Sequence, residues 1–200
     1  MSTSGSGSPT QSYHHGNLRQ ALIDAAVEML EQGENFSLRA VARWAGVSQT
    51  APYRHFPDRS KLESAVAAQG FRALGEELFA GREAPTRPED LPDFAVGYVR
   101  FAVERPRMFR LMFGTECDDE NDERVQAAGF LQAALTERLQ AIYPGTAVDD
   151  LAVGLWSTVH GLAFLHLDGK FPSEPSDQMD NRVRSAFAAV LGLAGQTVAR

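Results

Sequence analysis

Apolar positions along the chain recur every three to four residues, which is the period of an amphipathic α-helix. In the first such stretch, Asn17 is placed to cap a helix and Gly33 to end it in a left-handed turn. The apolar face between them consists of Leu18, Leu22, Ala25, Ala26 and Met29. No segment of any length shows the two-residue alternation of a β-strand, so the pattern predicts an all-α protein.

Cap and stop residues follow one another closely in the first third of the chain. Ser37 is placed to cap a short helix, Gly46 supplies a tight turn, and Ser48 is placed to cap a third helix that reaches about Phe56. Pro57 ends that helix, and Asp58 is placed to cap a fourth one. The pattern therefore predicts helices over residues 17–32, 38–45, 48–56 and 59–79.

The rest of the chain also has a helical pattern, interrupted by proline-rich and acidic segments. Residues 81–92 contain three prolines and predict a loop, while Pro106 stands where a first helical turn tolerates it. Further loops are expected at the acidic stretch 117–122, at Pro144-Gly145 and at 171–177. Between them the pattern predicts helices over 93–104, 106–113, 123–142, 149–167 and 178–198.

The composition is that of a globular protein. The chain has 200 residues, of which 44% are hydrophobic, and this is enough to bury a core. A single cysteine, Cys117, excludes a disulfide framework and a four-cysteine zinc site. There is no apolar run of about 18 residues and no signal-peptide pattern at the start, so we expect a cytoplasmic protein without a membrane partner.

The net charge of −7 is unevenly distributed. Residues 1–62 carry six basic and five acidic groups, whereas residues 63–200 carry 13 basic and 21 acidic groups. The first third is thus able to face a polyanion that the remainder would repel. Charge permits DNA binding without requiring it.

Residues 36–62 have the pattern of a helix-turn-helix unit, in which two short helices are joined by a glycine turn. The small residues Ala42 and Ala45 permit the two helices to cross closely. The second helix is expected to fit the DNA major groove, with Gln49 and Thr50 as the best candidates for base contacts. Its outward residues are Gln49, Thr50, Tyr53, Arg54 and His55.

These residues resemble the TetR/AcrR family of bacterial transcriptional repressors. The resemblance is carried by Ala42, Ala45-Gly46-Val47-Ser48, Tyr53-Arg54-His55-Phe56 and Lys61-Leu62. Downstream, Trp156, His160 and Gly161 resemble the Trp-x-x-x-His-Gly (WHG) signature of a subfamily named for its C-terminal ligand domain. Together the two matches extend over about residues 13–197.

The resemblance implies a homodimer that binds a palindromic double-stranded DNA operator and is released by a small-molecule effector. It implies a helix-turn-helix DNA-binding domain over residues 13–62, after a flexible tail at 1–12. A helical-bundle domain at 63–200 would bind the effector and form the dimer. We expect the dimer interface on the helices at 149–167 and 178–198, where the small residues Gly154, Ser157, Gly161, Ala186 and Ala189 favour close packing.

The family pattern also suggests contacts to the phosphate backbone. Tyr53 and His55 match phosphate-contacting positions, and Lys61 matches a cation at the start of the fourth helix. Phe56 is expected to be a core residue instead. Further candidate DNA contacts are Ser37, Arg39 and Arg54, with the alternative that Arg39 and Arg43 form a solvated face. Tyr13, His14 and His15 are either part of an ordered arm that reaches phosphate or disordered.

The recognition segment departs from the family at Ala51-Pro52, where many members have Thr-Leu. Pro52 falls at the fourth position of the predicted helix, where it removes one backbone hydrogen bond and crowds the Ser48 carbonyl. The first turn of this helix is therefore expected to be loose or 3₁₀-like. Trp44 is bulky for a surface position and is expected to pack on the fourth helix or to lie against DNA.

An effector site is expected among the many aromatic residues of the second domain. Tyr98, Trp156 and His160 are the candidate anchors, because each offers a polar atom on an apolar body. A histidine in such an apolar helix is also commonly a hydrogen-bonded core residue, so this alternative for His160 stays open. The complete candidate set for ligand binding is Tyr98, Phe101, Met112, Trp156, His160 and Phe164.

Other functions receive less support from the sequence. No nucleophile elbow, phosphate loop or HExxH pattern is present, so we expect neither an enzyme nor a metal or other cofactor. An enzyme would have to use His160 with Asp168 or Glu116. A transcriptional activator, or an architectural DNA-binding protein without an effector, is the nearer alternative to a repressor.

Overall fold

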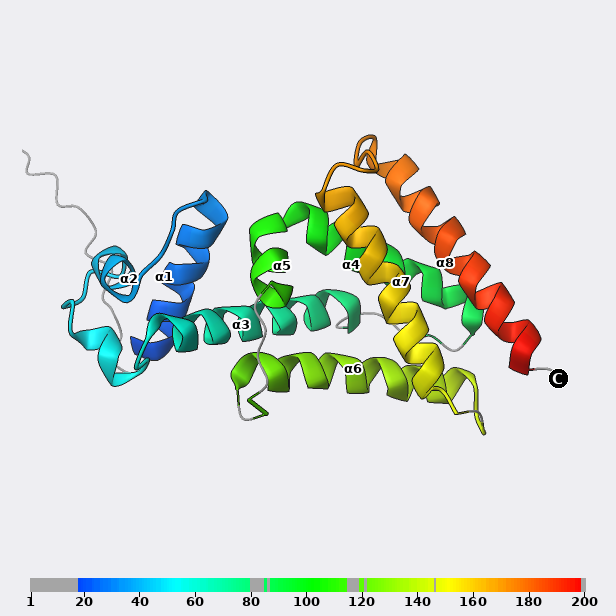
Figure 1. The fold of residues 1–200 in the computed structure, drawn as a ribbon, viewed down its shortest axis with the longest axis horizontal. Coiled ribbons are helices and arrows are strands. Elements are labelled where there is room, and N and C mark those ends of the chain that lie inside the picture. Colours follow the sequence, from blue (N-terminus) through cyan, green and yellow to red (C-terminus); the bar gives the residue numbers. More distant parts are fainter. Residues whose placement is uncertain are drawn as a thin grey trace, which may run out of the picture.

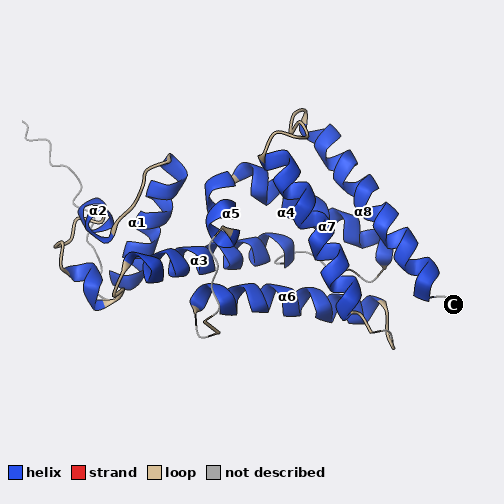
Figure 2. Cartoon of the chain, viewed as in Figure 1, coloured by secondary structure: helices blue, strands red, loops and turns tan. Residues whose placement is uncertain are grey.

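The computed structural model describes residues 18–79, 85, 87–114, 119–120, 122–145 and 147–198, with side chains as far as Gly192. In these ranges the regular structure is entirely helical (Figure 2), so the predicted all-α class is confirmed. The predicted tail, Tyr13, His14, His15, Glu116 and Cys117 lie outside the described residues.

The helices correspond closely to those expected from the sequence. The predicted bounds are matched at α3, α5, α6 and α7, and the other α-helices differ by one or two residues at an end. The elements are α1 (Leu18–Gln32), α2 (Leu38–Trp44), the 3₁₀-helix η1 (Ala51–Arg54), α3 (Arg59–Phe79), the 3₁₀-helix η2 (Pro88–Asp90), α4 (Leu91–Glu104), α5 (Pro106–Phe113), α6 (Glu123–Ile142), α7 (Asp149–Leu167) and α8 (Ser176–Val198).

One helix connects the two ends of the molecule. In Figure 1, α1, α2 and the segment that follows them form a small unit at one end, and α3 extends from this unit into the larger body. Helix α6 packs along α3, while α4, α7 and α8 pack against one another. With 21 residues, α3 is about 30 Å long, so it reaches from the helix-turn-helix unit deep into the bundle.

Two of the expected caps, Ser37 and Asp58, form at helix starts, whereas Ser48 does not cap a helix and Asn17 lies outside the described residues. The Ser37 side chain accepts a hydrogen bond from the Ala40 amide at 3.2 Å, and Asp58 accepts one from the Lys61 amide at 2.9 Å. The α1–α2 turn and the turn after α2 contain Gly33 and Gly46 with φ of +85° and +69°, where a side chain would be strained. These local signals explain why the helix boundaries were predictable.

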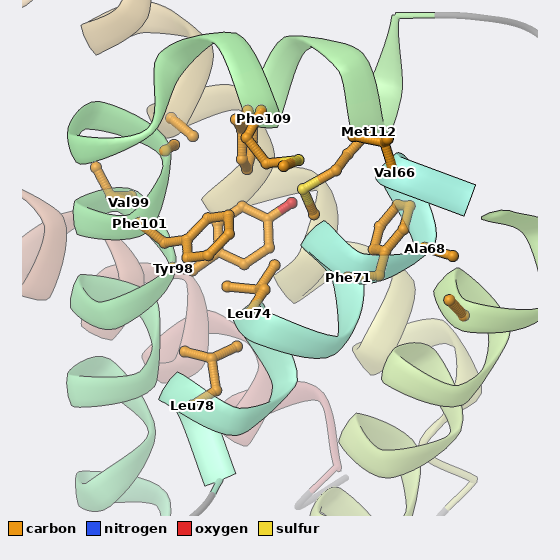
Figure 3. Packing of buried hydrophobic residues seen from close by; sticks show 14 of the residues in the cluster. Val66, Ala68, Phe71, Leu74, Leu78, Tyr98, Val99, Phe101, Phe109 and Met112 are labelled. Atoms are coloured by element: carbon orange, nitrogen blue, oxygen red, sulfur yellow. The ribbon is translucent and has the colours of Figure 1, made fainter. Parts of the chain in front are cut away.

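A continuous apolar core connects both parts of the chain. Figure 3 shows its central region, where side chains of α3, α4 and α5 meet. Gly70 permits the close approach of α5 to α3, because a Cβ placed there would lie 2.7 Å from the Met108 sulfur and 2.8 Å from the Met112 sulfur. The labelled core residues in this view are Val66, Ala68, Phe71, Leu74, Leu78, Tyr98, Val99, Phe101, Phe109 and Met112.

The expected third helix is much shorter than the predicted span of residues 48–56. Only Ala51–Arg54 is helical, and its geometry is 3₁₀. The cause is the one anticipated for Pro52: this residue has no N–H to donate to the Ser48 carbonyl, which accepts instead from the Ala51 amide at 3.0 Å. Gln49 and Thr50 therefore lie in a turn before the helix rather than in its first turn.

Candidate DNA interface and effector cavity

Five of the residues predicted to contact DNA are exposed within one short segment. Gln49, Thr50, Tyr53, Arg54 and His55 are all exposed, and 49% of the Tyr53 surface is accessible. They occupy seven consecutive positions together with Ala51 and Pro52. The segment therefore presents amide, hydroxyl, phenol, guanidinium and imidazole groups to the outside within a short stretch of backbone.

Two side chains anchor this segment to the core. Pro52 is buried, and Phe56 is 1% exposed at the end of the segment. The Arg19 guanidinium of α1 lies over the Phe56 ring, 5.1 Å from its centroid. The expectation that Phe56 is a core residue is confirmed, and the anchors explain why its neighbours point outward.

Three exposed arginines of the helix-turn-helix unit have no counter-charge within ion-pair distance among the described residues. Arg39, Arg43 and Arg54 are exposed, and among the described residues no carboxylate lies within ion-pair distance of any of them. Their charges are available to a polyanion. Ser37 is exposed, but its hydroxyl already accepts the Ala40 amide hydrogen bond at the start of α2.

Lys61 has carboxylate partners from the second part of the chain. Its Nζ donates to Asp122 at 3.1 Å and to Asp119 at 3.3 Å. The hydrogen bond to Asp122 contributes most to raising the pKa of Lys61 above its ordinary value. The role of Lys61 as a phosphate contact stays a prediction. In this conformation a DNA phosphate would have to compete with the two carboxylates for the Lys61 ammonium group.

Asp122 is the centre of a polar cluster where α6 begins. Its side chain is 5% exposed, accepts a hydrogen bond from the Ser64 hydroxyl of α3, and caps α6 by accepting from the Arg124 amide at 3.0 Å. Burial raises the pKa of Asp122, and the hydrogen bonds from Ser64, Lys61 and Arg124 together with the Lys61 charge lower it by more, so that it lies below its usual value. An ion pair between Arg19 and Glu123 also connects α1 to α6.

Trp44 makes a contact that the sequence did not predict. Its Nε1 donates to Glu28 of α1 at 2.9 Å, and the side chain remains 44% exposed. The indole therefore fastens α2 to α1, and the two contacts expected for it, with the fourth helix or with DNA, stay predictions.

An apolar cavity of about 70 Å³ lies inside the second part of the chain. Its wall is formed by α3, α4, α6, α7 and α8 together with Pro85. Among the lining residues, Tyr98 and Trp156 belong to the set predicted for ligand binding. The others that matter most for its chemistry are Phe71, Phe79, Phe94, Gln132, Arg138 and Phe187.

Tyr98, Trp156 and His160 are joined by hydrogen bonds. Trp156 Nε1 donates to the Tyr98 hydroxyl at 3.4 Å, and this hydroxyl lies 3.0 Å from His160 Nδ1. An indole N–H only donates, so the Tyr98 hydroxyl accepts from Trp156, and its own proton is free to point toward His160 Nδ1. Burial raises the pKa of Tyr98 and lowers that of His160, so both groups are neutral at pH 7.

The remaining members of the predicted ligand set lie next to the cavity rather than on its wall. Phe101 and Met112 are core residues, 0% and 2% exposed. The His160 ring lies among Phe109, Phe113 and Phe164, with centroids 5.7, 4.5 and 4.9 Å away. None of these residues lines the cavity, and a direct ligand contact for Phe101, Met112, His160 or Phe164 stays a prediction.

Arg138 is the lining residue that sequence reasoning should have identified. It follows Leu131 and Leu135 at intervals of four and three residues, so it continues the apolar stripe of α6 that faces the cavity. A cation in such a stripe is a signal for a polar anchor.

Helices α7 and α8 leave small side chains at the surface. Val153, Gly154, Ser157, Gly161 and Leu165 form an exposed stripe along α7. A Cβ built on Gly154 or Gly161 would meet no atom within 4 Å. On α8 the exposed residues include Ser185, Ala188, Ala189 and Gly192, whereas Ala186, one of those expected at the interface, is only half-exposed.

Two further features concern metals and membranes. Within the described ranges, no three side chains of His, Cys, Asp or Glu gather as metal ligands would. None of the described helices is both long and apolar enough to cross a membrane.

The fold is that of a helix-turn-helix protein with an attached helical bundle. A family profile described as "Tetracyclin repressor-like, C-terminal domain" matches residues 91–190, which is half of the chain. This chain therefore belongs to the TetR-like family of transcriptional regulators.

Individual relatives agree with this assignment. An uncharacterized HTH-type transcriptional regulator from Haemophilus influenzae is 49% identical over 114 residues, which is 55% of this chain and 56% of the relative. The match thus spans only about half the length of that relative.

Solved structures share the fold over most of the chain. A protein of unknown function from Rhodococcus sp. RHA1 is 30% identical with a TM-score of 0.73, covering 88% of this chain and 96% of its own. A TetR-family transcriptional regulator from Streptomyces coelicolor is 20% identical with a TM-score of 0.65, covering 88% of this chain and 83% of its own.

Proposed function

We propose that this chain is a homodimeric, DNA-binding transcriptional repressor that a small-molecule effector releases from a palindromic operator. Residues 13–62 would bind DNA, and residues 63–200 would bind the effector and form the dimer. The observation that carries this proposal is the exposed surface of Gln49, Thr50, Tyr53, Arg54 and His55, fixed by buried Pro52 and Phe56.

The two kinds of DNA contact fall to different residues of that surface. Gln49 and Thr50 would contact base edges. A glutamine amide pairs well with adenine, and a threonine hydroxyl is able to donate a hydrogen bond to a base or to accept one from it. Tyr53, His55 and the guanidinium groups of Arg39 and Arg54, which have no ion-pair partner among the described residues, would bind phosphates and fix the register. Ser37 and Lys61 would join them once their present partners are replaced.

The DNA proposal is tested by selecting sequences from a random duplex library with the purified chain. Gln49→Ala should weaken binding to the selected duplex by about 1–3 kcal/mol while leaving random duplex almost unaffected. Arg39→Gln should weaken both to a similar extent and reduce the salt dependence of binding. Failure to enrich any sequence would contradict the proposal.

The proposed dimer uses the outward stripes of α7 and α8. Arg100 of α4 donates to Asp180 at 2.9 Å and so holds one side of α8 against the bundle. The small exposed residues of α8 lie on its other, solvent-facing side. Two such helix pairs would form a four-helix interface. The partner chain would supply the second recognition segment that a palindromic operator requires.

The proposed effector site is the apolar cavity beside Tyr98 and Trp156. A cavity in this domain favours an effector-responsive regulator over an architectural DNA-binding protein, for which a filled core was expected. The hydrogen-bonded group of Tyr98, Trp156 and His160 fits the WHG subfamily signature, with His160 orienting Tyr98 from behind the cavity wall.

Two helices are placed to transmit effector binding to the DNA-binding unit. Helix α3 carries Phe71 and Phe79 of the cavity wall and also Lys61 and Ser64 near its start. Helix α6 carries Arg138 of the wall and begins at the Asp122 cluster. A shift of either helix would therefore move the recognition segment. A ligand that saturates the cavity yet leaves operator affinity unchanged would contradict this mechanism.

A further inference from the structure

We infer that the cavity takes a small amphipathic monocarboxylate, whose apolar body lies among the aromatic residues and whose carboxylate binds Arg138. This inference rests on the proposed effector cavity and adds the chemical class of its ligand. It is argued from the charge, size and lining of the cavity.

The charge of the lining points to an anion. Among the described residues that line the cavity, Arg138 is the only charged one and Gln132 the only amide, and no carboxylate is present. Both residues are on α6, where Arg138 is half-buried and Gln132 is exposed. The polar end of the site is therefore the α6 side, where the cavity approaches the surface.

Arg138 retains hydrogen-bonding capacity in this position. Its Nη1 donates to the Ala134 carbonyl at 3.0 Å, and the guanidinium carbon lies 3.8 Å from the centroid of the Phe79 ring. In the part of the chain that the structure describes, no Asp or Glu lies within ion-pair distance of it. The stacked ring holds the plane of the guanidinium, and the remaining N–H groups suit a carboxylate, which binds arginine through two parallel hydrogen bonds.

The size and the walls limit the rest of the ligand. A volume of about 70 Å³ is several times the roughly 10–15 Å³ that one water molecule requires, which corresponds to a single ring or a short branched chain. Six aromatic side chains contribute to the wall and favour edge and face contacts with a ring. They are Phe71, Phe79, Phe94, Tyr98, Trp156 and Phe187.

The test compares three probes of matched shape, namely benzoate, benzamide and benzylamine. The chain contains two tryptophans, so Trp44→Phe in the full-length protein leaves Trp156, on the cavity wall, as the single fluorescent reporter. We expect benzoate to change Trp156 fluorescence with an affinity at least tenfold above that of benzamide, and benzylamine to bind more weakly than either.

Variants of Arg138 test whether this side chain causes the preference for benzoate over benzamide. Arg138→Gln should remove the tenfold preference for benzoate and leave benzamide binding unchanged, whereas Arg138→Lys should keep part of the preference. Arg72→Gln is the matched control, since Arg72 is an exposed arginine of α3 that does not line the cavity. Thermal unfolding shows whether each variant is folded. If Arg138→Gln does not fold, the comparison of the three probes in the protein that keeps Arg138 still tests whether the cavity prefers an anion.

The outcomes separate this inference from the proposed function. Equal affinities for benzoate and benzamide, or a benzoate preference that survives in Arg138→Gln, would overturn the anionic ligand class and leave the cavity as an effector site for neutral molecules. If none of the probes alters Trp156 fluorescence or the unfolding temperature, the effector cavity itself fails, and the ligand class fails with it.

Discussion

At the scale of single residues, Asp122 joins the two parts of the chain. Its carboxylate accepts hydrogen bonds from Ser64 and Lys61 of α3 and also caps α6. Asp122→Ala should lower the free energy of unfolding by about 2–3 kcal/mol, since a helix cap and buried hydrogen bonds to a charged group are lost together. Urea unfolding followed by circular dichroism measures this change.

The neighbouring carboxylate provides the control for that measurement. Asp119 also binds Lys61, but its side chain is 49% exposed, so Asp119→Asn should change the unfolding free energy by no more than about 0.5 kcal/mol. Equal losses of unfolding free energy in the two variants would show that the burial of Asp122 does not determine its contribution to stability.

Buried His166 and half-buried His160 predict how stability depends on pH. Burial lowers the pKa of His160 and of His166, and the nearby Arg182 charge lowers that of His166 further. Both groups resist protonation in the folded protein, so their contribution is complete above the ordinary histidine pKa of about 6.5 and is lost as the pH falls toward the lowered values.

Unfolding free energies between pH 7.5 and pH 5 should therefore decrease with falling pH. His166→Gln should make this decrease less steep, whereas His55→Gln, at an exposed position, should leave it unchanged. A stability that is constant over this range would contradict the expected protonation of the two histidine rings on unfolding.

Two of the residues predicted to bind a ligand, Tyr98 and Trp156, do line the cavity. Tyr98 and Trp156 were predictable because each combines an apolar body with a polar atom in an apolar helix. Arg138 was not predicted, because the expected anchors were side chains that carry a polar atom on an apolar body. The partners of Lys61 were not predictable, since Asp119 and Asp122 are about 60 positions away in sequence and only the packing of α6 along α3 brings them close.

At the scale of elements, Pro52 determines the geometry of the recognition segment. Pro52→Ala restores an N–H that is able to donate to the Ser48 carbonyl, so residues 49–55 should become more α-helical. Backbone ¹³Cα chemical shifts measure this directly and should move toward helical values in that segment.

A second proline gives the matched comparison. Pro57 lies outside the 3₁₀-helix, in the turn before α3, so Pro57→Ala should leave the shifts of residues 49–55 unchanged. If Pro52→Ala also leaves them unchanged, the short 3₁₀ geometry has another cause, such as the burial of residue 52.

Most helices were predictable because their ends carry local signals. Ser37, Asp58 and Asp122 cap α2, α3 and α6 through their own side chains. The predicted length of the third helix is wrong because Ser48 does not cap it, so Pro52 is not its fourth residue. In the structure the Ser48 hydroxyl lies 3.3 Å from that of Thr50, and the helix begins at Ala51.

At the scale of the whole molecule, the proposed function requires a dimer. Gly161→Arg places a long cation on the exposed stripe of α7, where a Cβ would meet no atom of the described residues within 4 Å. The variant should fold normally and sediment as a monomer at micromolar concentrations, whereas the unmodified chain should sediment as a dimer.

Gly129→Arg is the control for this substitution. Gly129 is an exposed helical glycine of α6, and a Cβ built there also meets no atom within 4 Å. This variant should remain dimeric. Loss of the dimer in both variants would point to a general effect of the added charge rather than to an interface on α7.

The overall arrangement was predictable only through the resemblance of the helix-turn-helix residues to a known family. Periodicity and caps define each helix, but they do not say that α6 lies along α3 or that α7 and α8 pack against each other. Such long-range packing depends on how complete helix surfaces fit together, which a one-dimensional pattern does not contain.

The most direct test of the central claim is the stoichiometry of the chain on a selected duplex, measured by sedimentation or native mass spectrometry. We predict two chains for each duplex with paired half-sites, and a large loss of affinity when about five base pairs, half a helical turn, are inserted between the half-sites. A single bound chain, or an affinity that the insertion leaves unchanged, would contradict the account.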